Sequence, residues 1–211
     1  MREITALHSR KDRGGRVNIF LDGKYAFSLA AEVVAQEGLQ VKQALSADRI
    51  EALTGADRRQ RCLNAALHYL SYRPRSESEL REKLRQRGFT EDTRETVISR
   101  LKTQGLGDDM AFAQFWKDNR ETFNPRSRRL TVMELRRKGI ADDIINQVID
   151  TIDDEESAYQ AALSRVYRLP QSDYQGFSRR LGGFLKRRGF DYEVINHTVK
   201  RLWQETSDNS L

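Results

Sequence analysis

The first thirty residues contain short apolar runs that predict β-strands. The runs ITALHS, RVNIFL and YAFSL are rich in β-branched and aromatic residues, as strands usually are. Asp22-Gly23 separates the last two runs and favours a tight hairpin, because a type I′ turn needs positive φ angles. With a second loop at 11–15, residues 1–30 are predicted to form a three-stranded β meander.

Beyond residue 30 the apolar spacing becomes helical. Residues 30–37 predict a short helix, and Ser46 predicts an N-cap for the next one. Gly55 is expected to break that second stretch, so residues 31–60 are interpreted as connecting helices. A longer helix follows, in which apolar residues recur at helical spacing at Cys62, Leu63, Ala66, Leu67 and Leu70. No strand is predicted after residue 30.

Three segments of the chain end alike, which indicates an internal repeat. EKLRQRGF at 82–89, MELRRKGI at 133–140 and GFLKRRGF at 183–190 place their glycines 51 and 50 residues apart. A leucine stands four residues before each glycine, and apolar residues stand one, ten and thirteen residues after it. The tripeptide Pro-Arg-Ser at 74–76 also recurs at 125–127. Agreement at so many offsets predicts one structural unit used three times.

The repeated unit is predicted to be a helix, a glycine turn and a second helix, preceded by a third helix. Glycine suits the position after a helix because it adopts the left-handed backbone at little cost, and cations before it favour the negative end of the helix dipole. Ser76 and Ser127 are expected to be N-caps. We predict a mainly α fold, an elongated and curved tandem array of three three-helix modules at 61–107, 108–153 and 154–205, with a frayed tail at 206–211.

Composition narrows the class of protein. The 211 residues are 38% hydrophobic and 32% charged, which fits a soluble chain with a modest core. No apolar run approaches the ~18 residues that span a membrane, and the N-terminus lacks the core of a signal peptide, so we expect a cytoplasmic protein with no membrane partner. One cysteine, three dispersed histidines and the absence of a phosphate-binding loop or nucleophile motif predict no metal, no cofactor and no enzyme activity.

Charge is distributed unevenly along the chain. The net charge is +6, but residues 64–140 carry +6 and residues 165–203 carry +6, whereas residues 141–164 carry −7. Two basic blocks around an acidic segment suggest an extended polyanion or an acidic protein surface as partner. A solvated surface without a partner explains the same charges.

Thirteen cations around the repeated turns are the candidate partner-binding residues. Arginine captures carboxylates and phosphates with two parallel hydrogen bonds, and corresponding faces of the modules could join into one basic stripe. The alternative is that each cluster serves only its own helix end and solubility. The candidate set is Arg73, Arg75, Arg85, Arg87, Arg126, Arg128, Arg129, Arg136, Arg137, Lys138, Lys186, Arg187 and Arg188.

These motifs, in this order and with this period, resemble the RecX family of bacterial recombination regulators. The resemblance covers about residues 60–203 and rests on ALHYLSYRPRSESELREKLRQRGF, GLGDDMAFAQFW, ELRRKGI and FLKRRGF. It implies an all-helical array of three-helix modules that binds the RecA recombinase and its nucleoprotein filament. It further implies that the protein dampens ATP hydrolysis, strand exchange and co-protease activity from a position in the filament groove, and some members of the family touch DNA directly.

The resemblance carries no catalytic residue onto this chain, because the family's markers fall mostly on packing and capping positions. The chain departs from the family pattern at 125–129, where Pro-Arg-Ser-Arg-Arg stands in place of a glycine with few charges. The third module lacks the Pro-Arg-Ser entry. Two alternatives stay open: a helical protein that binds single- or double-stranded DNA without sequence preference, and a scaffold for another acidic protein. We expect a monomer.

Overall fold

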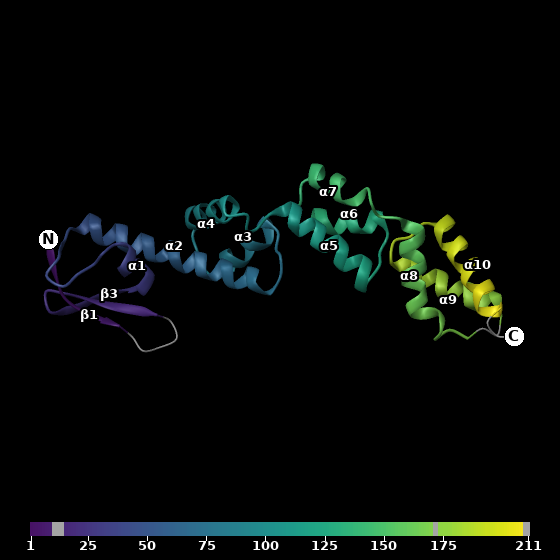
Figure 1. Ribbon diagram of the computed structural model, residues 1–211, viewed down its shortest axis with the longest axis horizontal. Helices are drawn as coiled ribbons and strands as arrows, with labels where there is room; N and C mark the ends of the chain where they lie inside the picture. Colours follow the sequence, from purple (N-terminus) through teal and green to yellow (C-terminus); the bar gives the residue numbers. More distant parts are fainter. Residues whose placement is uncertain (10–14, 171–172, 209–211) are drawn as a thin grey trace. The chain divides into compact units, whose positions relative to one another are not determined.

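The computed structural model describes residues 1–9, 15–170 and 173–208, and within these it has four strands and ten helices (Figure 1). The predicted mainly helical fold, preceded by a small group of strands, is confirmed. The chain divides into two compact units. The first contains Met1–Arg73 and Leu80–Leu106, and the second contains Pro74–Glu79 and Gly107–Leu211.

A four-stranded antiparallel sheet opens the first unit. Its strands are β1 (Arg2–Ser9), β2 (Arg16–Leu21), β3 (Lys24–Ala30) and β4 (Ala44–Leu45), in the order β3-β2-β1-β4. The Asp22-Gly23 hairpin is confirmed, with φ angles of 50° and 77°. Residues 11–14 of the second predicted loop lie outside the described residues. The prediction of no strand after residue 30 is wrong, because β4 pairs with the start of β1; two residues are too short to leave a periodic pattern.

The sheet buries one face against helices α1 (Ala31–Gln36) and α2 (Ala47–Tyr72). Val17, Ile19 and Leu21 alternate into this core along β2, as period-two patterning requires. Asp57 of α2 ties the sheet to the helix: its carboxylate accepts a 2.7 Å hydrogen bond from the backbone N–H of Ala30 and pairs with Arg16 at 3.2 Å.

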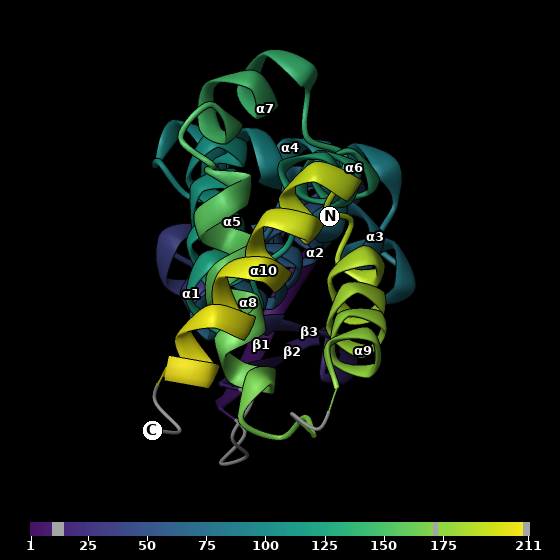
Figure 2. The ribbon, with the colours of Figure 1, turned by 90° about the vertical axis from the view of Figure 1, so that its right-hand side faces the viewer.

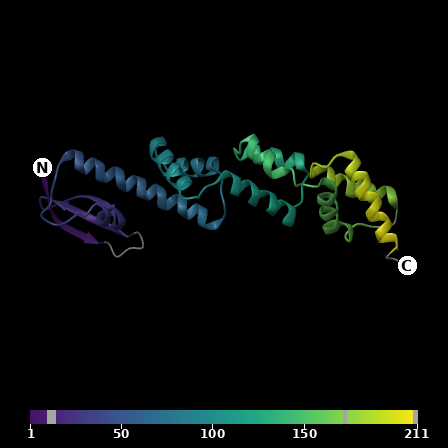
Figure 3. The ribbon, with the colours of Figure 1, turned by 45° about the horizontal axis from the view of Figure 1, so that its top comes forward.

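Helix α2 is continuous over 26 residues, so the predicted break at Gly55 is wrong (Figure 3). A helical glycine costs about 1 kcal/mol relative to alanine. Complete burial of Leu53 two residues earlier contributes ~1.5–3 kcal/mol, and the Asp57 contacts add to it, so packing exceeds the local penalty. The predicted N-cap is confirmed, since the Ser46 hydroxyl accepts a hydrogen bond from the N–H of Arg49. As a result, α2 runs across the module boundary predicted at residue 60.

The C-terminal half of α2 packs with α3 (Glu77–Gln86) and α4 (Glu91–Thr103) to form the first helical cluster. Its core includes Cys62 and Ala66 of α2, Leu84 of α3 and Leu101 of α4.

None of the described helices is long and apolar enough to cross a membrane.

Two further helical clusters make up most of the second unit. Helices α5 (Asp109–Phe123), α6 (Arg128–Arg137) and α7 (Asp142–Ile149) surround one core, and α8 (Asp154–Val166), α9 (Tyr174–Arg187) and α10 (Tyr192–Asp208) surround another. Figure 2 shows α10 beside α8 and α9, against both of which it packs. Residues 206–208, which the sequence analysis assigned to a frayed tail, continue α10. Residues 209–211 lie outside the described residues.

The same turn ends the basic helix of each cluster, as the repeat predicts. The three turns, here called helix-end turns, are Arg87–Phe89, Lys138–Ile140 and Arg188–Phe190, and their central glycines have φ angles of 81°, 78° and 90°. The leucine four residues before each glycine is fully buried. In the first two turns the residue after glycine donates its N–H to that leucine's carbonyl, at 3.3 and 3.2 Å, which is the Schellman pattern.

Candidate partner-binding surface

The first Pro-Arg-Ser tripeptide docks on a helix-end turn of the second unit. The Ser76 hydroxyl accepts a hydrogen bond from the N–H of Glu79 at 3.1 Å, which makes it the predicted N-cap, and donates one to the carbonyl of Lys138 at 2.7 Å. The backbones come close enough that a Cβ on Gly139 would lie 2.6 Å from the Cβ of Ser78. Ser76 therefore caps one helix and binds the end of another.

The second Pro-Arg-Ser tripeptide docks on the third helix-end turn through a backbone rather than a hydroxyl donor. The backbone N–H of Ser127 donates to the carbonyl of Arg188 at 3.0 Å, and its hydroxyl caps α6 through the N–H of Leu130 at 3.2 Å. A Cβ on Gly189 would lie 2.5 Å from that hydroxyl. Glycine is thus needed at this turn both for its backbone and for the space it leaves.

Lys138 and Arg188 belong to these docking contacts. The ammonium of Lys138 binds the Glu79 carboxylate at 2.6 Å and lies over the ring of Trp116. The guanidinium of Arg188 donates to the side-chain carbonyl of Asn124 and, at 2.9 Å, to the carbonyl of Pro125. Burial lowers the pKa of Arg188. Both cations hold neighbouring segments together.

Arg126 has a similar structural role through Glu134. The Glu134 carboxylate accepts hydrogen bonds from the indole N–H of Trp116 at 2.8 Å, from Arg120 at 2.7 Å and from Arg126. The carboxylate is only 11% exposed, and a buried charge is stable only when it is paired in this way. Arg126, Lys138 and Arg188 are therefore parts of the packing.

Exposed ion pairs hold three more of the predicted cations. Arg85 pairs with Glu82 at 2.7 Å, and the hydrogen bond lowers the pKa of Glu82 to about 2. Arg128 pairs with Asp150 at 2.6 Å, and Arg136 pairs with Asp142 at 2.8 Å. The last two pairs leave both side chains largely exposed. Such pairs contribute little stability, so a partner could recruit these arginines at small cost.

The cations of the first cluster have other surroundings. Arg73 and Arg75 flank Pro74 and are half-buried. Arg87 is exposed, and its guanidinium donates to the hydroxyl of Tyr69 at 3.0 Å while lying 5.2 Å from the centre of that ring.

Four predicted cations, Arg129, Arg137, Lys186 and Arg187, are exposed and make no hydrogen bond or ion pair with any described residue. Arg129 and Arg137 stand eight residues apart on α6, on either side of the exposed Met133. Positions four residues apart are neighbours on a helix, so the three side chains form an inclined row.

Helix α9 repeats this row fifty residues later, with Arg179 and Arg187 on either side of Gly183. Arg179 is also exposed and without a described partner. The sequence prediction missed Arg179, although its distance of 50 residues from Arg129 was a signal for it. The two arginine rows are therefore Arg129 with Arg137 and Arg179 with Arg187.

The first cluster lacks such a row. The corresponding positions on α3 are Ser78, Glu82 and Gln86, which carry no cation. The two arginine rows of the second unit, rather than the whole predicted set, thus form the candidate partner-binding surface.

Family models match three parts of the chain. The RecX regulatory protein N-terminal domain matches residues 2–46, the first RecX three-helix domain matches residues 62–101, and the second matches residues 108–149. Together these segments cover the sheet and the first two helical clusters.

Whole-chain relatives point to the same family. A regulatory protein RecX of Clostridium botulinum is 32% identical over 206 residues, 95% of this chain and 96% of the relative, and one of Clostridium perfringens is 30% identical over 96% of this chain and 97% of its own. A crystal structure of regulatory protein RecX is similar with a TM-score of 0.70 and 28% identity, covering 93% of this chain and 98% of that one. The structure of RecX from Lactobacillus salivarius has a TM-score of 0.59 and 26% identity, covering 70% and 97%. This chain belongs to the RecX family of regulatory proteins.

Proposed function

We propose that this protein regulates RecA by binding its nucleoprotein filament, and that it suppresses the filament's ATPase, strand exchange and co-protease activities. Membership of the RecX family supports the partner. The observation that supports the contact surface is the pair of arginine rows on α6 and α9, whose guanidinium groups are exposed and have no described partner.

Free guanidinium groups are the most favourable contacts for an acidic partner. A guanidinium binds carboxylate or phosphate oxygens with two parallel hydrogen bonds, and an unpaired one breaks no internal ion pair when it does so. Arg128 and Arg136 would first have to leave Asp150 and Asp142, so they are secondary contacts. The proposal requires both arginine rows to face the same partner.

The decisive assay is the DNA-dependent ATPase of RecA, with this protein added in substoichiometric amounts. We expect inhibition by the unaltered protein and a loss of about tenfold or more in inhibitory potency for the double variants Arg129→Glu/Arg137→Glu and Arg179→Glu/Arg187→Glu, because charge reversal repels an acidic surface. The matched control is Arg58→Glu/Arg59→Glu, which makes the same charge change at exposed positions of α2.

Two outcomes would count against the proposal. No inhibition by the unaltered protein, under conditions that sustain filaments, would exclude RecA as the regulated partner. Full inhibition by both arginine-row variants, with helical circular dichroism unchanged, would exclude the arginine rows as the contact surface.

Direct DNA binding is the second candidate function, because free arginines also suit phosphates. Binding to bare DNA through four arginines would weaken with salt at a logarithmic slope of about −3 to −4, since each neutralised phosphate contributes roughly −0.9. Tight, salt-sensitive binding to bare DNA that RecA does not enhance would favour this alternative.

A further inference from the structure

The helix-end turn of the first cluster, unlike the other two, is open. A Cβ built on Gly139 or Gly189 meets the preceding serine segment, whereas a Cβ on Gly88 meets nothing within 4 Å. The carbonyl of Arg87, equivalent to those of Lys138 and Arg188, receives no hydrogen bond from any described residue. The three turns are alike in sequence and backbone, so the first retains the same capacity to bind.

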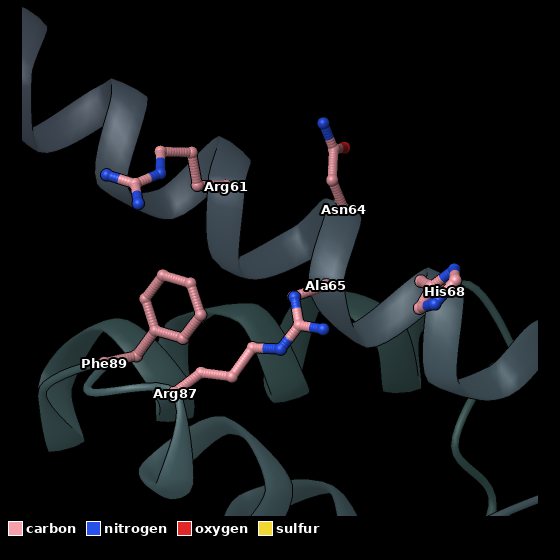
Figure 4. A pocket seen from close by; sticks show the side chains of 6 residues that line it. All are labelled: Arg61, Asn64, Ala65, His68, Arg87 and Phe89. Atoms are coloured by element: carbon pink, nitrogen blue, oxygen red, sulfur yellow. The ribbon is translucent and has the colours of Figure 1, made fainter. Parts of the chain in front are cut away.

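A cavity of about 390 Å³ lies beside this open turn. Arg61, Asn64, Ala65 and His68 of α2 line it together with Arg87 and Phe89 (Figure 4). Figure 4 shows the Arg87 side chain reaching toward Ala65. The residue 51 positions after Ala65 is Trp116, which lies beneath Lys138 in the second cluster. Alanine in place of tryptophan leaves room at the first turn.

The contacts at the second turn indicate what the first would bind. There a serine N-cap donates its hydroxyl to the turn carbonyl, and an acid three residues later pairs with the turn cation, as Ser76 and Glu79 do with Lys138. At the second turn this acid offsets the partial positive charge that a helix N-terminus brings near a cation. At the third turn Leu130 takes its place, and the cation Arg188 instead binds Asn124 and the carbonyl of Pro125. Arg87 supplies that cation in the first cluster, and Arg61 adds a second at the cavity.

A second copy of this chain does not fit these requirements. Among the described helices, only α3 begins with a hydroxyl N-cap followed three residues later by an acid, and its Ser76 and Glu79 already bind Lys138. Helix α9, the counterpart of α3 in the third cluster, begins at Asp173 with Gly176 three residues later. The occupant must therefore come from another protein.

We propose that the open helix-end turn at Gly88 and the cavity beside it bind the N-terminus of a helix of a partner protein, with the sequence Ser/Thr-x-x-Asp/Glu. The partner's hydroxyl donates to the carbonyl of Arg87, and its acid pairs with the Arg87 guanidinium. This site does not include the arginine rows and goes beyond the function proposed above.

A peptide that copies Arg73–Gln86 tests the proposal directly. A hydrocarbon staple between the positions of Arg81 and Arg85 keeps it helical, and a fluorophore at its C-terminus reports binding to the full-length protein by anisotropy. We expect saturable binding that weakens about tenfold or more in the protein variant Arg87→Glu. A peptide with alanine for Ser76 and glutamine for Glu79 should lose as much, because it lacks both the hydroxyl and the acid.

The protein variant Arg180→Glu is the matched control, since it makes the same charge change at an exposed cation that lies outside the arginine rows and far along the sequence, and it should bind the peptide unchanged. Absence of binding at millimolar peptide, when circular dichroism shows the peptide to be helical, overturns the proposal. Equal binding by the Arg87→Glu variant also overturns it. The assay contains no RecA, so its failure would leave the proposed function standing.

Discussion

Ser76 and Lys138 are joined by a 2.7 Å hydrogen bond across 62 residues of sequence, and the backbone N–H of Ser127 donates to the carbonyl of Arg188 across 61 residues. One repeat is about 50 residues long, so each contact links a tripeptide to the turn of the following repeat. The Pro-Arg-Ser motif is thus a connector between consecutive helical segments. The third repeat lacks this tripeptide.

The helix-end glycines should differ in their tolerance of alanine. Gly88→Ala introduces only the strain of a left-handed alanine, ~1–2 kcal/mol, because its Cβ would meet nothing within 4 Å. Gly189→Ala adds overlap with Ser127 and Leu130, and overpacking costs a further ~1–3 kcal/mol. Urea denaturation should therefore show the larger loss of unfolding free energy for Gly189→Ala. Equal losses of unfolding free energy would mean that Ser127 moves away from the added methyl group at no cost.

The two functions of Ser76 can be separated by comparison with Ser46. Both serines cap helices, and losing a cap costs about 1 kcal/mol. Ser76→Ala also leaves the Lys138 carbonyl without its donor at a buried site, which costs a further ~1–3 kcal/mol. We expect Ser76→Ala to lower the urea midpoint clearly more than Ser46→Ala does. A midpoint shift no larger than that of Ser46→Ala would contradict the second role.

Glu134 should matter more than the acids of exposed arginine pairs, such as Glu82. Glu134→Gln leaves Arg120 and Arg126 facing each other without a counter-charge in a half-buried site. Breaking a fully buried pair costs ~3–5 kcal/mol, and partial exposure here reduces the expected loss to about 2 kcal/mol. The control Glu82→Gln removes an exposed pair and should leave the thermal midpoint nearly unchanged. Similar midpoints for the two variants would argue against the Glu134 network.

Cys62 provides a probe of opening in the first unit. The thiol is completely buried, and desolvation raises its pKa to about 11, above the ordinary ~8.5 of an unfolded chain. A disulfide reagent at pH 8 should therefore react slowly with the folded protein and rapidly in denaturant. Stability should also fall as pH rises from about 9 toward 11, because only the unfolded chain ionises readily there. Immediate reaction of the folded protein would contradict this burial.

Local sequence preferences were sufficient to predict the turns and the helix N-caps. Asp22-Gly23, the N-cap at Ser46 and the glycine turn at Gly139 depend on backbone preferences that a short segment carries by itself. The apolar positions after each turn, such as Ile98 and Leu101, are buried as the repeat predicted. These features need no knowledge of distant parts of the chain.

Tertiary contacts decided the features that the sequence prediction missed. Gly55 stays helical because Leu53 and Asp57 are anchored in the sheet core. The roles of Arg126 and Arg188 depend on Glu134 and Asn124, and a list of charges does not show which cations already have internal partners. The contacts of Ser76 with Lys138 and of Ser127 with Arg188 were also missed. Aligning the repeats reveals equivalent positions, whereas these contacts join positions that are not equivalent.

Helix α2 places Leu53 in the core beneath the sheet and Cys62 in the first helical core. Removal of either core would expose the apolar residues that α2 buries in it, and the remaining core needs α2 to stay folded. Gain or loss of repeats during evolution is therefore expected downstream of Leu101, and the sheet and first helical cluster should be inherited together.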